Sequence, residues 1–164
     1  MRIVALFGVV AVSLACTVSS ATAALLITVN KSTQSLTVTR DGKVLHRWRV
    51  STGRPNYGTP SGTFTAFRME AEHFSKEWDD APMPHSVFFT KQGHAIHGSY
   101  DTKRLGSPAS HGCVRLAPAN AATLFALVKQ EGLSNTRVVL TGSEQVALAR
   151  AKAERTANSL RRDV

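Results

Sequence analysis

Short segments rich in β-branched residues follow one another from residue 24 onward, and they constrain the fold of this chain more than any other feature. Asp41-Gly42 separates two of them, residues 36–39 and 44–50, and this dipeptide is typical of a tight hairpin. Further strand-like segments lie at residues 25–29, 63–67, 87–90, 94–97 and 136–140. A length of 164 residues suits one domain with its own core. The sequence therefore predicts a single, mainly β domain.

Two helical patterns flank the predicted strands. Pro118 opens the first, whose apolar residues fall on one side, and Gly132 ends it. Ser143 begins the second, which carries Glu144 early and its basic residues late, as the helix dipole favours. We therefore expect a mixed β arrangement with flanking helices, followed by a basic C-terminal helix or tail at residues 143–164.

The N-terminus has the pattern of a secretory signal peptide, residues 1–23. Arg2 precedes an apolar run, residues 3–16, and the small-residue stretch after it ends in Ala21-Thr22-Ala23. The run is short for a membrane anchor, and lipid attachment at Cys16 is a further alternative. Cleavage after residue 23 predicts an exported protein of the periplasm or cell wall, with no transmembrane segment in the mature chain.

The number of cysteines and the net charge further limit the disulfides and the partners that this chain can have. Only Cys16 and Cys113 are present, so a chain cleaved after residue 23 keeps one thiol and forms no internal disulfide. The formal net charge of +9 favours polyanionic partners, or it serves solubility alone. Export makes nucleic acid the least expected of those partners.

Most of the reactive side chains lie in residues 93–118. Ser110-His111-Gly112-Cys113 places a thiol beside a histidine, and His97 lies a short distance upstream. A thiol becomes a strong nucleophile when a nearby base takes its proton. In an extended segment His111, Cys113 and Arg115 would share one face. The stretch predicts cysteine acyl transfer.

Two other interpretations of this stretch stay open on spacing alone. A free cysteine in a strand is often simply buried in the core. His97, His111 and Cys113 could also bind zinc, with Asp101 or His94 as a fourth ligand, although His-x-Cys is an unusual pairing for that ion.

The segment Ile96-His97-Gly98, followed by residues 110–116, resembles the signature of the L,D-transpeptidase (YkuD-type) catalytic domain of bacterial cell-wall enzymes. Residues 50–53 and 59–64 resemble the upstream block of that family, and the likeness covers about residues 25 to 140. It implies an L,D-transpeptidase-like mixed β-sandwich, a catalytic domain at residues 24–142 and no cofactor.

The resemblance implies a reaction on peptidoglycan stem peptides. Cys113 would attack the carbonyl of the third stem residue, release D-alanine and hold the stem as a thioester. An amine acceptor, which is a second stem or a wall-anchored protein, would then take the acyl group. Water as acceptor would make a carboxypeptidase, and a non-catalytic wall-binding module is a further alternative. Carbapenems are expected to capture the cysteine.

The resemblance also implies roles for residues around Cys113. His97 matches the proton acceptor and donor, and the carbonyl of Gly98 would orient its ring. The backbone N–H groups of His111, Gly112 and Cys113 would form the oxyanion hole.

Other residues are expected at the substrate or on the surface. Arg115 would pair with a stem carboxylate or serve structure alone, and Ser110 would act through hydrogen bonds rather than as a nucleophile. The remaining residues expected to line the donor pocket are Met83, Phe88 and Tyr100. Residues 69–84 would form an acidic surface excursion or lid. Four histidines are expected outside the site, with His46, His73 and His85 on the surface and His94 packed behind its strand.

Overall fold

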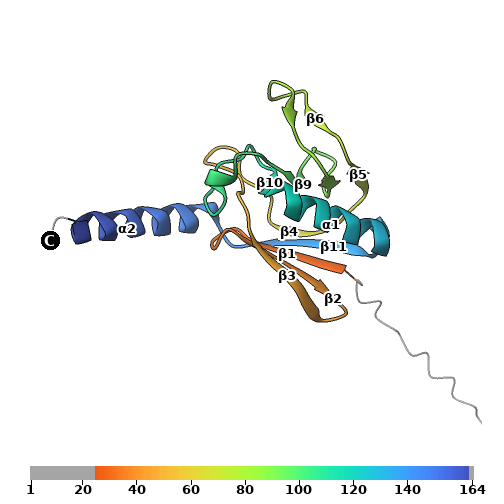
Figure 1. The fold of residues 1–164 in the computed structure, drawn as a ribbon, viewed down its shortest axis with the longest axis horizontal. Helices are drawn as coiled ribbons and strands as arrows, with labels where there is room; N and C mark the ends of the chain where they lie inside the picture. The colour runs from red at the N-terminus through yellow and green to blue at the C-terminus, as the bar shows by residue number, and fades with distance from the viewer. Residues whose placement is uncertain (1–24, 163–164) are drawn as a thin grey trace, which may run out of the picture.

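The computed structural model describes residues 25–162, which form two sheets, a small hairpin and two long helices (Figure 1). The first sheet has the strand order β3-β2-β1-β11-β4. Its strands are β1 (Leu25–Asn30), β2 (Ser35–Arg40), β3 (Lys43–Arg49), β4 (Gly62–Thr65) and β11 (Thr136–Thr141). β1 and β11 pair in parallel, and the other neighbours are antiparallel, so the sheet is mixed.

The second sheet carries the segments that the sequence marks as reactive. Its order is β10-β9-β8-β5, and β10 and β9 pair in parallel. Its strands are β5 (Arg68–Glu70), β8 (Ser86–Phe88), β9 (Ala95–Gly98) and β10 (Val114–Leu116). The main core combines buried residues from both sheets and from α1, whereas Phe88 and Ala95 of the second sheet pack in a smaller cluster with Met83. The predicted mainly β, mixed sandwich with flanking helices is confirmed.

The hairpin between β2 and β3 forms where Asp41-Gly42 predicts it. Asp41 has φ 48° and Gly42 has φ 76°, and two successive positive values are what the tightest hairpin turns need. In β1 buried and half-buried residues alternate, and Leu25, Ile27 and Val29 face the core.

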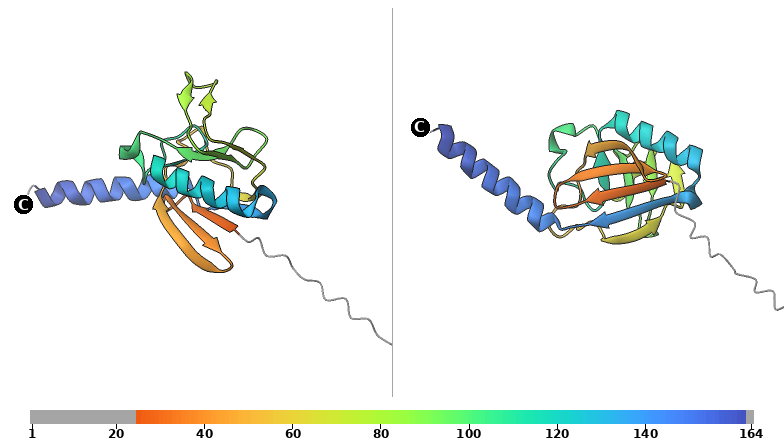
Figure 2. Two further views of the ribbon diagram at one scale, coloured as in Figure 1. Left: turned by 45° about the vertical axis from the view of Figure 1, so that its right-hand side comes forward. Right: turned by 90° about the horizontal axis from the view of Figure 1, so that it is seen from below.

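Helix α1 (Pro118–Glu131) packs beside β9, β8 and β1 (Figure 2). Pro118 occupies its first turn, where a missing N–H costs nothing. Leu124 and Val128 are buried, and the N–H of Gly132 closes the last turn on the carbonyl of Val128 at 2.9 Å. Both ends of this helix lie where the sequence predicts them.

Helix α2 (Glu144–Arg162) leaves the domain and extends away from it (Figures 1 and 2). Its first turn packs on the domain through Glu144 and Ala147, whereas residues 152–161 are exposed. Two 3-10 turns, η1 (Thr102–Arg104) and η2 (Leu133–Asn135), are the remaining helical elements within residues 25–162. None of the helices in residues 25–162 is both long and apolar enough to cross a bilayer. The predicted signal peptide and Cys16 lie outside the described residues.

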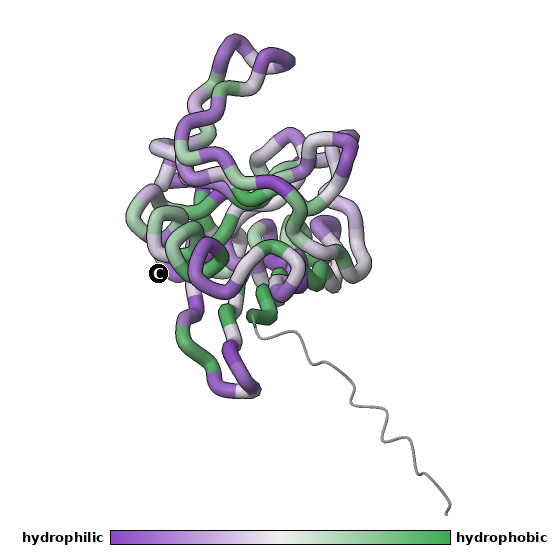
Figure 3. The backbone as a smooth tube through the Cα atoms, turned by 90° about the vertical axis from the view of Figure 1, so that its right-hand side faces the viewer, coloured by the Kyte–Doolittle hydropathy of each residue, from purple (hydrophilic) through white to green (hydrophobic). Residues whose placement is uncertain are grey.

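The excursion at residues 69–84 contains a small two-stranded hairpin that the sequence pattern does not indicate. β6 (Phe74–Ser75) and β7 (Ala81–Pro82) pair antiparallel and protrude from the second sheet (Figure 1). Figure 3 shows that the protruding segment is largely hydrophilic, whereas hydrophobic segments gather in the body of the domain. Strands of two residues are too short for a period-2 pattern to be detected.

Candidate active site

A cavity of about 570 Å³ lies beneath the β6–β7 hairpin and receives the side chains that the sequence marks as reactive. His97, His111, Cys113 and Arg115 all line it. β9 and β10 run in parallel with Arg115 opposite His97, so the two segments of the motif meet. His111 and Cys113 lie in a turn that precedes β10 rather than in an extended strand, so this turn, and not the alternation that we expected, brings them to the cavity with Arg115.

His97 is held by its own neighbour in the chain. His97 is 6% exposed, and its Nδ1 lies 2.7 Å from the carbonyl oxygen of Gly98. A carbonyl only accepts hydrogen bonds, so Nδ1 carries the proton and Nε2 is free to accept one. Burial lowers the pKa of His97 to about 4, and the charge of Arg115 acts in the same direction. The imidazole is therefore neutral at pH 7.

The Cys113 thiol is also neutral before reaction. Burial raises its pKa, although a backbone hydrogen bond from Ala95 and the charge of Arg115 act in the opposite direction. Its Sγ lies 3.8 Å from the carbonyl oxygen of Gly93, to which the thiol donates weakly. A neutral thiol thus faces the same cavity as a neutral imidazole, which suits proton transfer during attack.

Ser110 holds the turn that presents the cysteine. Its Oγ donates to the carbonyl of Cys113 at 2.5 Å and accepts the N–H of Gly112 at 3.1 Å. The hydroxyl is therefore a hydrogen-bonding element, as predicted. The same contact differs from our expectation for Gly112, because its N–H already has an acceptor and does not point freely at a substrate.

Gly112 is required here for its backbone rather than for its N–H. Its φ is 114°, a value that disfavours any side chain, and a Cβ would lie 3.1 Å from the His94 ring. The N–H groups of His111 and Cys113 donate to no other group within residues 25–162. Of the three N–H groups that we expected to bind an oxyanion, the one of Gly112 is therefore already engaged.

A family model described as the L,D-transpeptidase catalytic domain matches residues 24–142 of this chain. The chain belongs to the L,D-transpeptidase family. YqjB of Bacillus subtilis (strain 168), which is provisionally named an L,D-transpeptidase, is 28% identical over 127 residues, covering 70% of each protein.

Solved structures agree with the family at the level of the fold. An L,D-transpeptidase from Mycobacterium smegmatis superimposes with a TM-score of 0.65 at 26% identity, covering 72% of this chain and 58% of that one. A second, from Stackebrandtia nassauensis, has a TM-score of 0.64 at 28% identity and covers 73% and 56%. LdtMt1, solved in complex with imipenem, has a TM-score of 0.65 at 26% identity and covers 72% and 59%. This family member thus spans less than two thirds of each of these structures.

The five predicted substrate-contacting residues, including Ser110 and Arg115, all line the cavity of this L,D-transpeptidase family member. Met83 and Phe88 are buried and pack with Ala95 against Cys113, whereas Tyr100 lies at the rim with 71% of its surface exposed. Arg68 is a further lining residue that the sequence does not single out, and its guanidinium lies 3.6 Å from the centre of the Phe88 ring.

Two histidines that we expected outside the site line the cavity. His73 pairs its Nδ1 with Glu70 at 2.5 Å, and its ring meets the Phe88 ring edge-on at 5.1 Å. His94 precedes β9 instead of lying within it, so its ring turns toward the cavity and accepts or donates a hydrogen bond at Thr90. His46 stacks on Trp48, and His85 lies edge-on to Phe125. The sequence predicts the excursion at residues 69–84, but it gives no sign that His73 would contact Phe88 of β8.

Trp78 makes an unexpected contact with the signature motif. Its ring stacks on the ring of His111 with centroids 3.6 Å apart and planes 10° apart. Tyr57 meets both rings edge-on, at 5.4 Å from Trp78 and 5.0 Å from His111. The excursion at 69–84 therefore touches the catalytic segment directly. No group of three or more His, Cys, Asp or Glu that could bind a metal ion lies within residues 25–162.

Removal of the Trp78 ring is expected to open the cavity. In Trp78→Ala the hairpin loses its stacking contact with His111, so iodoacetamide should modify Cys113 several-fold faster, measured by peptide mass. Trp48→Ala is the matched control, because Trp48 also stacks on a histidine but lies on β3 away from the cavity. Equal rates for both variants would mean that the stack does not restrict access to the thiol.

Proposed function

We propose that this protein is a peptidoglycan L,D-transpeptidase that works through a thioester on Cys113. The observation that carries the proposal is that a buried His97, whose Nδ1 is held by the Gly98 carbonyl, lines the same cavity as the Cys113 thiol. The tetrapeptide stem is the acyl donor, D-alanine leaves, and an amine of a second stem or of a wall-anchored protein accepts the acyl group. The substrate class follows from the family to which the chain belongs.

The first half of the reaction forms the thioester. The Cys113 sulfur attacks the carbonyl of the third stem residue while its proton passes to Nε2 of His97. Negative charge develops on the carbonyl oxygen, where the N–H groups of His111 and Cys113 would stabilise it. The carbon–nitrogen bond then breaks, and the proton on Nε2 goes to the departing D-alanine amine. Gly98 keeps the ring in the required tautomer throughout.

The second half transfers the acyl group. The acceptor amine attacks the thioester and gives a proton to Nε2 of His97, and the Cys113 thiolate leaves and is reprotonated from that nitrogen. The product with a second stem is a 3→3 cross-link. Attack by water would give the tripeptide instead.

The cavity offers charged and apolar groups that suit a stem peptide. Arg115 and Arg68 supply guanidinium groups for its carboxylates, because Arg binds carboxylates in a bidentate manner. Met83 and Phe88 supply an apolar wall for its alkyl chain. Export to the periplasm or cell wall, after removal of residues 1–23, would bring the enzyme to this substrate.

A muropeptide digest tests the proposal. The protein is incubated with disaccharide-tetrapeptide, and the products are resolved by mass spectrometry. A 3→3 dimer together with free D-alanine is the expected result. Tripeptide with no dimer would identify a carboxypeptidase. No product, with or without an added amine acceptor, would contradict both activities and favour a wall-binding module.

A further inference from the structure

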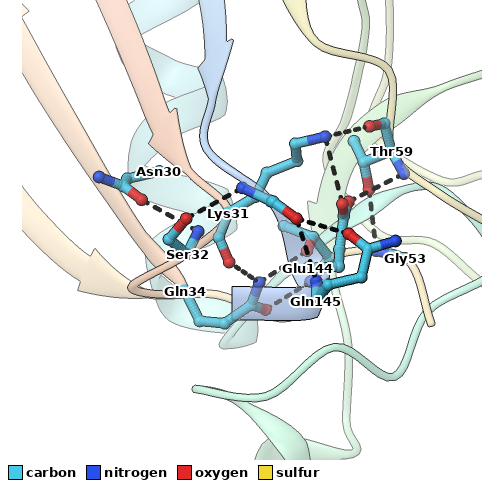
Figure 4. A network of polar contacts seen from close by, with 10 residues as sticks. Asn30, Lys31, Ser32, Gln34, Gly53, Thr59, Glu144 and Gln145 are labelled. Atoms are coloured by element: carbon cyan, nitrogen blue, oxygen red, sulfur yellow. Dashed lines mark hydrogen bonds and ion pairs between the residues drawn. The ribbon is translucent and has the colours of Figure 1, made fainter. Parts of the chain in front are cut away.

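The first turn of α2 lies beyond the residues that match the family, yet it carries a buried carboxylate. Glu144 is 8% exposed, and its Oε2 lies 3.2 Å from Nζ of Lys31, which is 5% exposed (Figure 4). The Lys31 ammonium and the Glu144 carboxylate are therefore both buried at the N-terminal end of α2, whose remaining turns protrude from the domain. Such burial is costly unless further hydrogen bonds satisfy both groups.

Those further hydrogen bonds converge on the backbone of Thr59. Glu144 accepts the N–H of Thr59 at its Oε1, at 3.1 Å, and Lys31 donates to the carbonyl of Thr59 at 2.8 Å (Figure 4). Both backbone groups of one loop residue are therefore fixed by the two members of the ion pair.

Thr59 in turn holds the segment that pairs with the catalytic motif. Its Oγ1 accepts the N–H of Gly53 at 2.8 Å. Gly53 forms a parallel bridge with Ser110, and the N–H of Arg54 donates to the Ser110 carbonyl at 2.9 Å. Space is tight at this point, because a Cβ on Gly53 would lie 1.8 Å from the Tyr57 carbonyl oxygen. A shift of Thr59 would therefore move Gly53 and Ser110.

Gln34 supports the same loop from a second side. It is 1% exposed, its Nε2 donates to Oγ1 of Thr52 at 2.7 Å, and its Oε1 accepts the N–H of Thr52 at 2.9 Å. The carbonyl of Thr52 then accepts the N–H groups of Ala109 and Ser110, both at 2.9 Å. Ser110 contacts Cys113 and Gly112 directly, as described above. Hydrogen bonds, together with the peptide bond between Gly53 and Arg54, therefore connect Glu144 to the Ser110–Cys113 turn.

We propose that Glu144 is a positioning residue, which acts with Lys31 through Thr59 and Gly53 to fix the Ser110–Cys113 turn for oxyanion binding. The inference rests on the proposed function of Cys113 as the nucleophile. It assigns the base of α2, outside the matched domain, to the machinery of acyl transfer. The two charges are then retained for geometry rather than for their mutual attraction, since a buried pair can often be replaced by apolar residues at little cost in stability.

The test replaces the pair by apolar residues of similar size, in Lys31→Met/Glu144→Leu. Acylation of Cys113 by imipenem needs the oxyanion donors, and we expect its rate to fall at least tenfold. Alkylation by iodoacetamide needs only the thiol and should stay within twofold. The melting temperature should fall, because the buried N–H and C=O of Thr59 lose their partners. Arg150→Ala/Glu154→Ala is the matched control, because it removes an exposed ion pair of 2.8 Å from the same helix. It should leave both rates unchanged.

Hydrogen exchange supplies a readout that does not depend on the reaction. The Gly112 amide is expected to exchange at least tenfold faster in the apolar double variant and at the wild-type rate in the control. A double variant with wild-type acylation and wild-type exchange would overturn the proposal, as would equal losses in acylation and alkylation. If that variant does not fold, Glu144→Gln replaces it with a threefold slower acylation expected, and unchanged acylation would overturn the proposal. A wild-type protein that imipenem does not acylate would instead count against the proposed function, with the exchange result still deciding this inference.

Discussion

Replacing Cys113 by alanine is expected to abolish acyl transfer, with a loss of about 10⁴-fold or more in kcat. The neighbouring Ser110 hydroxyl is not expected to replace the thiol, because it already donates to the Cys113 carbonyl. Release of D-alanine from tetrapeptide substrate measures the loss. The mass of the wild-type protein should increase by one adduct after treatment with imipenem, and the mass of the variant should not.

The fold should survive this substitution. The side chain of Cys113 is small, and its removal from beside Met83 and Phe88 is expected to cost about 1 kcal/mol of unfolding free energy. Circular dichroism and a melting curve serve as controls. An alanine variant that still forms dimers would eliminate the thioester mechanism, whereas one that does not fold would leave Cys113→Ser as the informative variant, with activity close to zero.

The substitution His97→Gln is expected to lower kcat by about 10²- to 10⁴-fold, the usual contribution of a positioned general base.

The same substitution, His97→Gln, should also change how the free energy of unfolding depends on pH. The ring has a pKa of about 4 in the folded protein against 6.5 for an ordinary imidazole. Between these values the unfolded chain binds more protons, so the wild type loses stability as pH falls from 6.5 toward 4. The loss due to His97 amounts to about 3 kcal/mol.

Denaturant unfolding at several pH values measures this effect. The free energy of unfolding of the wild type should fall more steeply than that of His97→Gln over this window. His46→Gln is the control, because that ring stacks on Trp48 in β3 and does not line the cavity. Parallel curves for wild type and His97→Gln would mean that the histidine is protonated as readily in the folded protein as in the unfolded one.

Features encoded within a few consecutive residues were predictable from the sequence. The hairpin at Asp41-Gly42 follows from turn residues that tolerate positive φ, and α1 follows from Pro118 at its start and Gly132 at its end. Both depend on local backbone geometry. Strand alternation does not explain how His111, Cys113 and Arg115 come to line one cavity, because His111 and Cys113 lie in a turn before β10.

The contacts between distant segments were decided by the tertiary structure alone. Trp78 lies on His111 because the turn between β6 and β7 reaches the segment before Cys113, and β strands of two residues leave no periodic signal. The acceptor of the Gly112 N–H is decided by the rotamer of Ser110, which a motif does not record.

The link between α2 and the active site is also a contact between distant segments of the chain. From the sequence alone, Glu144 is an acidic residue in the first turn of a helix, where it complements the helix dipole. In the fold it is a buried partner of Lys31, 113 positions away in the chain, and it fixes Thr59. Residue types and spacing determined what chemistry this protein can carry, and packing between remote segments decided which groups hold that chemistry in place, because such contacts have no local pattern.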